Sequence, residues 1–164
     1  MSIVILTGPA AAGKNSVSKI IAQKLKKCAV IDVDTVRQML VKPHKAPWQG
    51  KEGKRQQLLG VKNASLLAKN FSDDKTDVII LDVITNETAK LYKKYLGKVK
   101  IFLLMPSYDI AIKRFKERKA LISITEKEFK ILYRWEQDLT IFDKKIDNST
   151  MFPEEVANQI IEQV

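Results

Sequence analysis

The sequence is poor in the residues that cross-link secreted proteins or bind zinc. It contains one cysteine, Cys28, and one histidine, His44, so a disulfide within the chain is impossible and a zinc site built on several such ligands is excluded. We expect Cys28 to be a small buried thiol. No apolar run approaches the roughly 20 residues that a membrane span needs. Because the first strand-like run begins at Ile3, we expect no signal peptide and a cytoplasmic location.

Arginine is also scarce, although the chain carries a net charge of +10 from 29 basic and 19 acidic residues. Most of the basic residues are lysines on predicted helices, a pattern typical of solvated helix faces. The charge also fits an anionic partner such as a nucleotide or a nucleic acid. Because planar phosphate clamps favour arginine over lysine, the arginines are more informative than the total charge. They are Arg37, Arg55, Arg114, Arg118 and Arg134.

Short apolar runs rich in β-branched residues alternate with longer segments of helical periodicity. This alternation predicts an α/β fold with a parallel sheet whose strands are buried on both faces. No repeat or linker divides the chain, so we expect a single domain over residues 1–164, which is long enough for one sizeable core. The predicted strands are 3–7, 29–33, 77–84, 99–105 and 144–147.

Capping residues help to place the helices. Asn86 is a candidate N-cap, and Thr125 with Glu128 has the spacing of a capping box. Two segments, 42–53 and 116–124, escape the helical pattern, and both are candidate mobile loops. Helices are predicted over 14–27, around 58–71 and over 153–164, and also from near residue 86, after residue 107 and after residue 125.

Residues 8–14 form a glycine-rich turn, Gly-Pro-Ala-Ala-Ala-Gly-Lys, between the first predicted strand and the first predicted helix. In this context the pattern G-x-x-x-x-G-K predicts a Walker A phosphate loop. The glycines let backbone amides converge on phosphates, the helix N-terminus adds N–H groups, and Lys14 reaches the β and γ oxygens. An ordinary strand-to-helix turn is the alternative. The residues expected to bind ATP are Gly8, Ala10, Ala11, Ala12, Gly13, Lys14, Asn15 and Ser16.

Asn15 departs from this pattern. The residue after the loop lysine is normally the Ser or Thr whose hydroxyl ligates Mg²⁺. The amide oxygen of Asn15 can also ligate Mg²⁺, but its longer side chain would hold the ion more loosely. Ser16 can still donate to an α-phosphate oxygen from the first turn of the helix. The site therefore either works with a weakened metal ligand or binds nucleotide without turnover.

With this loop placed, the chain resembles the small P-loop kinases of the nucleoside-monophosphate and shikimate kinase type, most closely the branch around chloramphenicol phosphotransferase. The resemblance implies a three-layer P-loop fold with a five-stranded parallel sheet in the order 2-3-1-4-5, and ligands at the carboxyl ends of the strands. The glycine-rich substrate turn of shikimate kinases is lacking, so shikimate is not the expected substrate. The segments that carry the resemblance are 8–16, 31–37, 78–82, 103–118 and 146–149.

Three aspartates lie at or near the ends of predicted strands, at that edge of the sheet. Asp32 and Asp34 differ by two positions along a strand, so we expect both side chains on one side, where they would suit a metal-directed acid and a base. The resemblance implies that Asp34 accepts the proton of a substrate hydroxyl, Asp32 holds a magnesium-bound water and Asp82 is the Walker B acid at Mg²⁺. The alternatives are that Asp34 caps a helix beginning at Thr35 and that Asp82 caps a helix or lies in a solvated turn.

Arg114 and Arg118 are four positions apart on a predicted helix and therefore share a face. They lead into the 116–124 segment, which corresponds to the lid of the kinases that the chain resembles. The resemblance implies that both arginines close over the phosphates and offset the charge that develops during transfer. A pair of surface arginines bonded to helix acids such as Glu117 is the alternative.

The acceptor side has two further candidate residues. Arg37 lies one helical turn after Asp34, where it is positioned to anchor a substrate. Trp48, in the 42–53 substrate loop, either closes on a flat or apolar acceptor or packs beneath its own loop. The segment 147–149 corresponds to the family loop beside the adenine base.

Taken together, these residues predict an ATP- and Mg²⁺-dependent phosphotransferase that moves the γ-phosphoryl group to a hydroxyl or phosphate of a small molecule. One alternative is a nucleotide-binding protein with weak or lost catalysis, because of Asn15. The other is a kinase or binder of nucleic-acid ends, because of the charge of +10. A nucleic-acid partner is not favoured, and no membrane partner is expected.

Overall fold

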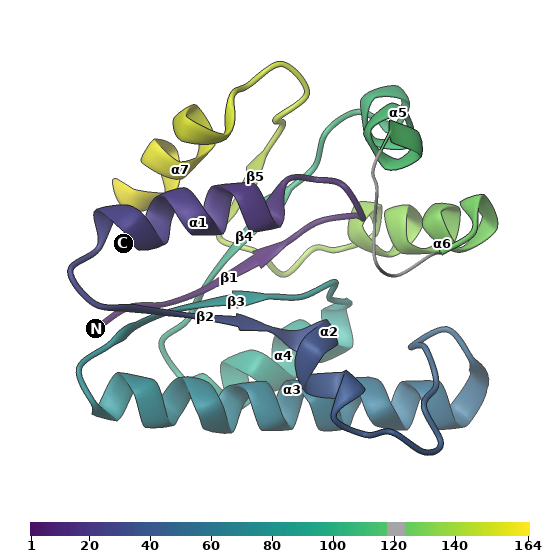
Figure 1. Ribbon diagram of the computed structural model, residues 1–164, viewed down its shortest axis with the longest axis horizontal. Coiled ribbons are helices and arrows are strands. Elements are labelled where there is room, and N and C mark those ends of the chain that lie inside the picture. The colour runs from purple at the N-terminus through teal and green to yellow at the C-terminus, as the bar shows by residue number, and fades with distance from the viewer. Residues whose placement is uncertain (118–123) are drawn as a thin grey trace.

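Five parallel strands form one sheet in the order β2-β3-β1-β4-β5, which confirms the predicted fold class and strand order (Figure 1). The computed structural model describes residues 1–117 and 124–164. The predicted strands are correct to within a residue or two, except that β3 ends three residues early, where Asp82 turns back to accept the N–H of Val83. The strands are β1 (Ile3–Thr7), β2 (Cys28–Asp32), β3 (Asp77–Leu81), β4 (Lys100–Leu104) and β5 (Lys144–Ile146).

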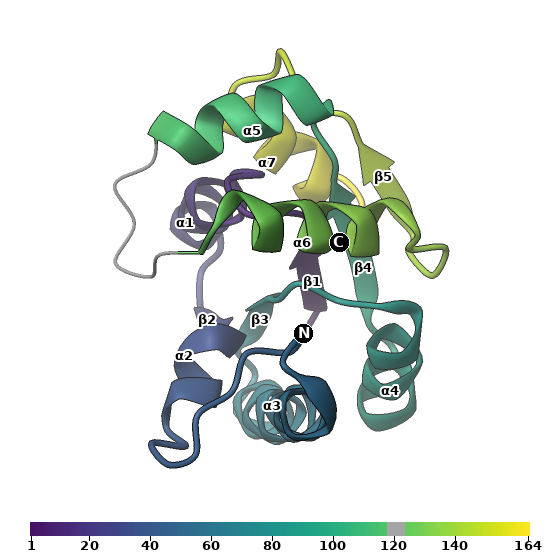
Figure 2. The ribbon, with the colours of Figure 1, turned by 90° about the vertical axis from the view of Figure 1, so that its right-hand side faces the viewer.

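Helices cover both faces of the sheet. α1 (Lys14–Lys24) and α7 (Pro153–Ile161) lie on one face, and α3 (Gly50–Asp73) and α4 (Asn86–Leu96) lie on the other (Figure 1). The remaining helices, α2 (Val33–Gln38), α5 (Tyr108–Glu117) and α6 (Glu126–Gln137), lie toward the carboxyl ends of the strands. Figure 2 looks at that edge and shows α6 crossing in front of the end of β1.

Alternating strand side chains build a core on each face of the sheet. Ile5 of β1 packs with side chains of α3 and α4, whereas Leu6 packs with side chains of α1 and α7. Ala64 and Ala68 are fully buried, and these small residues let the long α3 helix lie close to the strands. No helix among residues 1–117 and 124–164 is long and apolar enough to span a membrane.

Side-chain caps determine where α4 and α6 begin. The hydroxyl of Thr125 accepts the N–H of Glu128, and the Glu128 carboxylate accepts the N–H of Thr125, which confirms the predicted capping box. α4 begins at Asn86, but its N-cap is Thr85. The predicted Asn86 cap is wrong, because the Asn86 side chain instead accepts the N–H of Thr140 at 2.9 Å.

The segment predicted as a mobile loop, 42–53, is partly helical and partly held against a helix. Its last four residues belong to α3, which begins at Gly50, so the predicted loop end is wrong. Gln56 of α3 accepts one backbone N–H of the preceding connection and donates to one of its carbonyls. A side chain at Gly53 would clash with the backbone of that connection. The 42–49 connection therefore packs on the first turns of α3.

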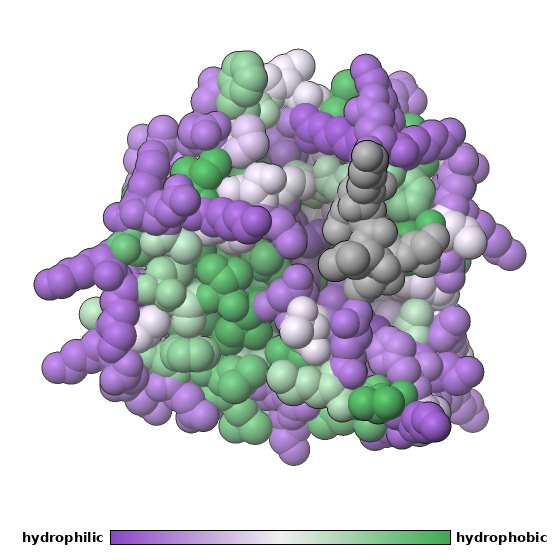
Figure 3. Space-filling view, in the orientation of Figure 1, coloured by the Kyte–Doolittle hydropathy of each residue, from purple (hydrophilic) through white to green (hydrophobic). Residues whose placement is uncertain are grey.

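One edge of the sheet, β2, is flanked by exposed hydrophobic side chains. Figure 3 shows this hydrophobic area between α1 and α3. Exposed hydrophobic side chains of these elements are Val30 of β2 and Leu66 and Phe71 of α3. Cys28, at the start of β2, is half-buried rather than buried, and burial followed by the charge of Asp77 raises its pKa, which disfavours a reactive thiolate.

Candidate functional site

The 8–14 turn joins β1 to α1 through a left-handed backbone. The angle φ is +146° at Gly8, +62° at Ala11 and +94° at Gly13. A side chain at Gly8 would clash with the backbone carbonyl of Leu104 in β4, so the turn passes close to the sheet. Gly13 is the N-cap of α1, and no side chain of the described residues caps that helix. Backbone N–H groups at such a helix start are available to an anion.

Lys14 is the first residue of α1, and its side chain points back toward the start of the 8–14 turn. Its Nζ donates to the carbonyl oxygens of Gly8, at 2.5 Å, and Pro9, at 3.1 Å. Asn15 and Ser16 follow on the exposed surface of the first helical turn. The residues predicted to bind phosphate therefore lie together at the carboxyl end of β1.

Asp32 and Asp34 lie at the carboxyl end of β2, but not as neighbours on one side of a strand. Asp32 ends β2 and is the N-cap of α2, because its Oδ1 accepts the N–H of Asp34 at 3.0 Å. Asp34 lies exposed in the first turn of α2, where its Oδ1 accepts Nη1 of Arg37 at 3.0 Å. Two predictions are thus wrong: the pair does not alternate along a strand, and the capping residue is Asp32, so the helix begins two residues before Thr35.

Arg37 connects Asp34 to the interior. Its side chain is 8% exposed, and its stem crosses Gly60 of α3, where a Cβ would lie 2.6 Å from Cγ of Arg37. Its Nε is buried and has no hydrogen-bond partner among residues 1–117 and 124–164. A buried donor without a partner is costly.

Asp82 follows β3 and is 8% exposed. Its Oδ2 accepts the hydroxyl of Tyr92 at 2.7 Å, and its Oδ1 accepts the N–H of Val83 at 2.8 Å. The pKa of Asp82 is raised from 3.8 to about 7, mainly by burial and to a lesser degree by the charge of Asp34, against the Tyr92 hydrogen bond and the charge of Arg37, which lower it. A cation beside this carboxylate would offset the cost of its burial.

Another buried carboxylate, which the sequence alone did not predict, lies near the 8–14 turn. Glu136 of α6 is fully buried, and its Oε1 accepts the hydroxyl of Thr7 at 2.5 Å and the N–H of Ile84 at 3.1 Å. Burial raises the pKa of Glu136 from 4.5 to about 7, against the Thr7 hydrogen bond and the positive charge of Lys14.

The sequence holds one signal for Glu136. Phe129, Leu132 and Glu136 are the buried residues of α6, so the glutamate occupies a position of the apolar stripe. A charged residue at an apolar position of a helical period is the pattern that would have identified it.

No protein-family model and no curated protein matches this sequence. Solved structures do match over nearly the whole chain. A sugar kinase from Janibacter sp. HTCC2649 has a TM-score of 0.77 at 11% identity, with 99% of this chain and 93% of that chain covered. The tunicamycin resistance protein of Deinococcus radiodurans has a TM-score of 0.71 at 17% identity, covering 99% and 94%. The Mycobacterium tuberculosis APS kinase CysC, in complex with AMPPNP and APS, has a TM-score of 0.72 at 15% identity, covering 98% and 95%.

The chain has the fold of the small P-loop kinases. At these identities the likeness shows the fold alone, because one fold serves many substrates. Substrate and chemistry therefore have to be inferred from the residues of this chain.

In this fold, Arg114 of α5 lies beside the 8–14 turn. Its Nη2 donates to the carbonyl oxygens of Asn148 and Ser149, both at 3.1 Å. Asn148 is 4% exposed, and its Nδ2 donates to the carbonyl of Ala12 at 2.8 Å. Arg114 and Asn148 line a cavity of about 280 Å³ together with the first turn of α1. Arg114 thus contacts the 147–149 segment, one of those that carried the resemblance.

Trp48 fastens the 42–49 connection to α6. Its Nε1 donates to Oε1 of Glu128 at 3.0 Å, and the indole is half-buried. The predicted partner of Arg114, Arg118, lies outside the described residues, as does most of the predicted 116–124 lid. The paired role of these arginines stays a prediction.

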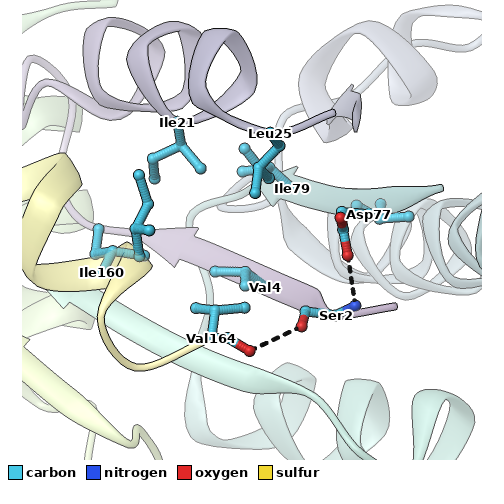
Figure 4. A pocket seen from close by; sticks show the side chains of 10 residues that line it. Ser2, Val4, Ile21, Leu25, Asp77, Ile79, Ile160 and Val164 are labelled. Atoms are coloured by element: carbon cyan, nitrogen blue, oxygen red, sulfur yellow. Dashed lines mark hydrogen bonds between the residues drawn. The ribbon is translucent and has the colours of Figure 1, made fainter. Parts of the chain in front are cut away.

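A second cavity, of about 200 Å³, lies at the amino end of the strands (Figure 4). Apolar side chains of β1, α1, β3 and α7 line most of it. Its polar groups bond one another: the backbone N–H of Ser2 donates to Asp77 at 2.8 Å, and the hydroxyl of Ser2 donates to the carbonyl of Val164 at 3.2 Å. Because no predicted site residue lines this cavity, we place the candidate site at the carboxyl edge.

Proposed function

We propose that this chain is an ATP-dependent phosphotransferase that moves the γ-phosphoryl group to a hydroxyl or phosphate of a small molecule. The observation that carries the proposal is the presence, at one edge of the sheet, of the 8–14 turn and of an exposed carboxylate, Asp34, fixed by Arg37. The turn alone would serve any phosphate ligand. A positioned carboxylate at the same edge of the sheet adds a base for an attacking hydroxyl.

Each residue has a proposed part in this reaction. The backbone of the 8–14 turn and Lys14 bind the β- and γ-phosphates, and Asp34 accepts the proton of the acceptor hydroxyl. Arg37 anchors the acceptor, and Trp48 borders its pocket. Arg114 lines the cavity beside the turn, so we propose that it supports the nucleoside in addition to acting with Arg118 on the phosphates.

Asp82 and Asp32 are the residues that would hold Mg²⁺, with Asn15 as a weaker ligand. Among the described residues, no group of three or more acidic, histidine or cysteine side chains could hold a metal by itself. This composition fits Mg²⁺ in a phosphotransferase, since the ion keeps several waters and uses one or two carboxylates together with substrate phosphates. When bound, Mg²⁺ supplies positive charge that offsets the charge of the transferred group.

The direct test of the proposal is ADP formation from MgATP in the presence of candidate acceptors. The panel takes its compounds from the names of the similar structures: simple sugars, APS and tunicamycin. We expect slow hydrolysis with water and a marked rise in ADP with one class of acceptor. No ADP from the panel or from water would refute the phosphotransferase proposal.

One observation favours a second function, a nucleotide-binding regulator without turnover. Asn15 takes the place of the metal-binding hydroxyl, and it lies exposed on the first turn of α1. Turnover by the parent protein would exclude this second function. Activity that appears only after Asn15 is replaced by serine would establish it.

Asn15→Ser should therefore strengthen the use of Mg²⁺. A short hydroxyl suits the near-ideal octahedral geometry that Mg²⁺ demands, whereas the longer amide favours an outer-shell contact. We expect the Mg²⁺ concentration for half-maximal ATP hydrolysis to fall several-fold, with unchanged affinity for ADP in the absence of metal. The same Mg²⁺ dependence in both proteins would show that Asn15 does not face the metal.

Gly60→Ala should test the placement of Arg37. Alanine suits a helix interior better than glycine by roughly 1 kcal/mol, so α3 itself should not be destabilised. The new methyl group would displace the Arg37 stem and with it the contact to Asp34. We expect ATP hydrolysis to fall about tenfold, a loss of ~1.4 kcal/mol in transition-state binding, with little change in ATP affinity.

A double-mutant cycle provides the control for this substitution. If Gly60→Ala acts through Arg37, it should cost nothing further in an Arg37→Ala background. An equal loss in both backgrounds would show that the methyl group disturbs something else.

A further inference from the structure

Glu136 lies close to the phosphate turn, where the proposed reaction has no use for an acid. It comes from α6, the helix that crosses the carboxyl edge of the sheet in Figure 2. Thr7, the last residue of β1, and Ile84, in the connection from β3 to α4, both donate to its Oε1. Its Oε2 is buried and has no hydrogen-bond partner among the described residues. The carboxylate is thus fixed through one oxygen only.

Besides the hydrogen bonds from Thr7 and Ile84, two groups that a nucleotide would need also favour the ionised form of Glu136. They are the positive charge of Lys14 and the backbone N–H of Gly8. Both belong to the 8–14 turn, whose N–H groups and lysine bind phosphates in the proposed function. Phosphates entering the turn would therefore draw Lys14 and Gly8 away from the carboxylate, and their own negative charge would oppose it.

We propose that Glu136 takes up a proton when the phosphates of a nucleotide enter the 8–14 turn, and so acts as a positioning residue that releases Lys14 to them. The proton comes from solvent, and the new O–H bond forms at Oε2, because Oε1 already accepts two hydrogen bonds. No other bond is made or broken. The inference rests on the nucleotide binding of the proposed function and not on phosphoryl transfer.

Glu136 is the acidic group at this position whose pKa lies near neutral pH. From α1 it faces the charge of Lys14, while β1 and the connection after β3 offer a threonine hydroxyl and a backbone N–H. Asp82, in the same connection as Ile84, bonds Tyr92 and Val83 instead. A variant at Glu136 therefore separates its proton from that of Asp82.

The test is calorimetry of MgATP binding at pH 7.5 in two buffers that differ in ionisation enthalpy. The difference in observed heat gives the protons taken up. Because burial places the pKa of Glu136 near 7, a carboxyl that becomes protonated on binding takes up as much as roughly 0.7 proton. We expect this uptake in the parent and in Glu162→Gln, an exposed control at the end of α7, and its loss in Glu136→Gln.

Glu136→Gln should fold, because its amide oxygen can still accept the hydrogen bonds of Thr7 and Ile84. Its N–H₂ group takes the place of Oε2, the oxygen that would carry the proton in Glu136. Between pH 6.5 and 8.5, MgATP affinity should fall roughly tenfold in the parent and by less than twofold in this variant. The melting temperature of the variant should also depend less on pH. A role in packing alone would leave the proton uptake unchanged.

A second variant keeps the test decisive if the first does not fold. Thr7→Val removes a donor to Oε1, so more of Glu136 is already protonated and the uptake should shrink, whereas Thr7→Ser should retain it. Equal uptake in the parent, Glu136→Gln and Thr7→Val would overturn the inference and leave Glu136 as a permanent counter-ion of Lys14. Proton uptake without ADP formation would support the inference about Glu136 and refute the phosphotransferase function. A parent protein that does not bind MgATP would refute both the inference and the proposed function.

Discussion

Lys14→Ala should reduce the affinity for MgATP about 100-fold while the chain remains folded. The ammonium group of Lys14 lies against the 8–14 turn, where it donates to the carbonyls of Gly8 and Pro9. In the proposed function it donates to the β- and γ-phosphate oxygens. Hydrogen bonds to charged groups contribute about 1.5–3 kcal/mol each, so losing this group costs about 3 kcal/mol of binding free energy. The side chain lies outside the hydrophobic core, and therefore folding should survive. Calorimetric titration with MgATP measures the loss.

Lys19→Ala is the matched control, because Lys19 is exposed on the same helix. Lys14→Ala should also carry a pH signature. Glu136 has a folded pKa above its unfolded value, so its ionisation destabilises the fold as pH rises through about 7. Removing the charge of Lys14 raises that pKa further, and the melting temperature should fall increasingly below that of the parent between pH 6 and pH 8. Unchanged MgATP affinity would show that the 8–14 turn is not the phosphate site.

The central strands β1, β3 and β4 could be predicted because they are buried on both faces, whereas the expectation of full burial is wrong for the edge strands β2 and β5, which are partly exposed. Residues 3–7 are all buried, so β1 appears in the sequence as a continuous apolar run, and the glycine-rich turn after it marks the carboxyl edge. The start of α6 was predicted correctly, because Thr125 and Glu128 form its capping box. The cap of α4 was predicted wrongly, because the neighbouring Thr85 caps that helix and frees Asn86 for a contact 54 residues away.

The parts of the site that could not be predicted depend on contacts between distant segments. The Asp34 and Arg37 pair follows from helical spacing, since residues three apart share a face. The bond from Thr7 to Glu136 joins positions 129 apart, and the small space over Gly60 that admits the Arg37 stem exists only once α3 has packed on α2. Helical periodicity identifies which positions are buried, but not which distant residues they meet.

Asp34→Asn should lower the turnover rate by about 10²–10⁴ and leave MgATP affinity nearly unchanged, which is the usual effect of losing a general base. Asparagine keeps an oxygen that can accept from Arg37, so the ion pair becomes a hydrogen bond from the charged guanidinium to a neutral amide, without a change of shape. What is lost is the carboxylate that accepts the proton of the acceptor. ADP formation at saturating MgATP and acceptor measures the loss, with water as the acceptor until a better one is identified.

Two comparisons separate a base from a metal ligand. Asp32→Asn removes a carboxylate whose proposed role is at Mg²⁺, so it should raise the Mg²⁺ requirement, whereas Asp34→Asn should not. Asp73→Asn, at the exposed end of α3, serves as the matched control for a lost surface charge. Because Asp34 is exposed and hydrogen bonds to Arg37 rather than to the core, its loss should barely change the melting temperature. Weakened MgATP binding with normal turnover at saturation would show that Asp34 is a metal ligand and not the base for the acceptor.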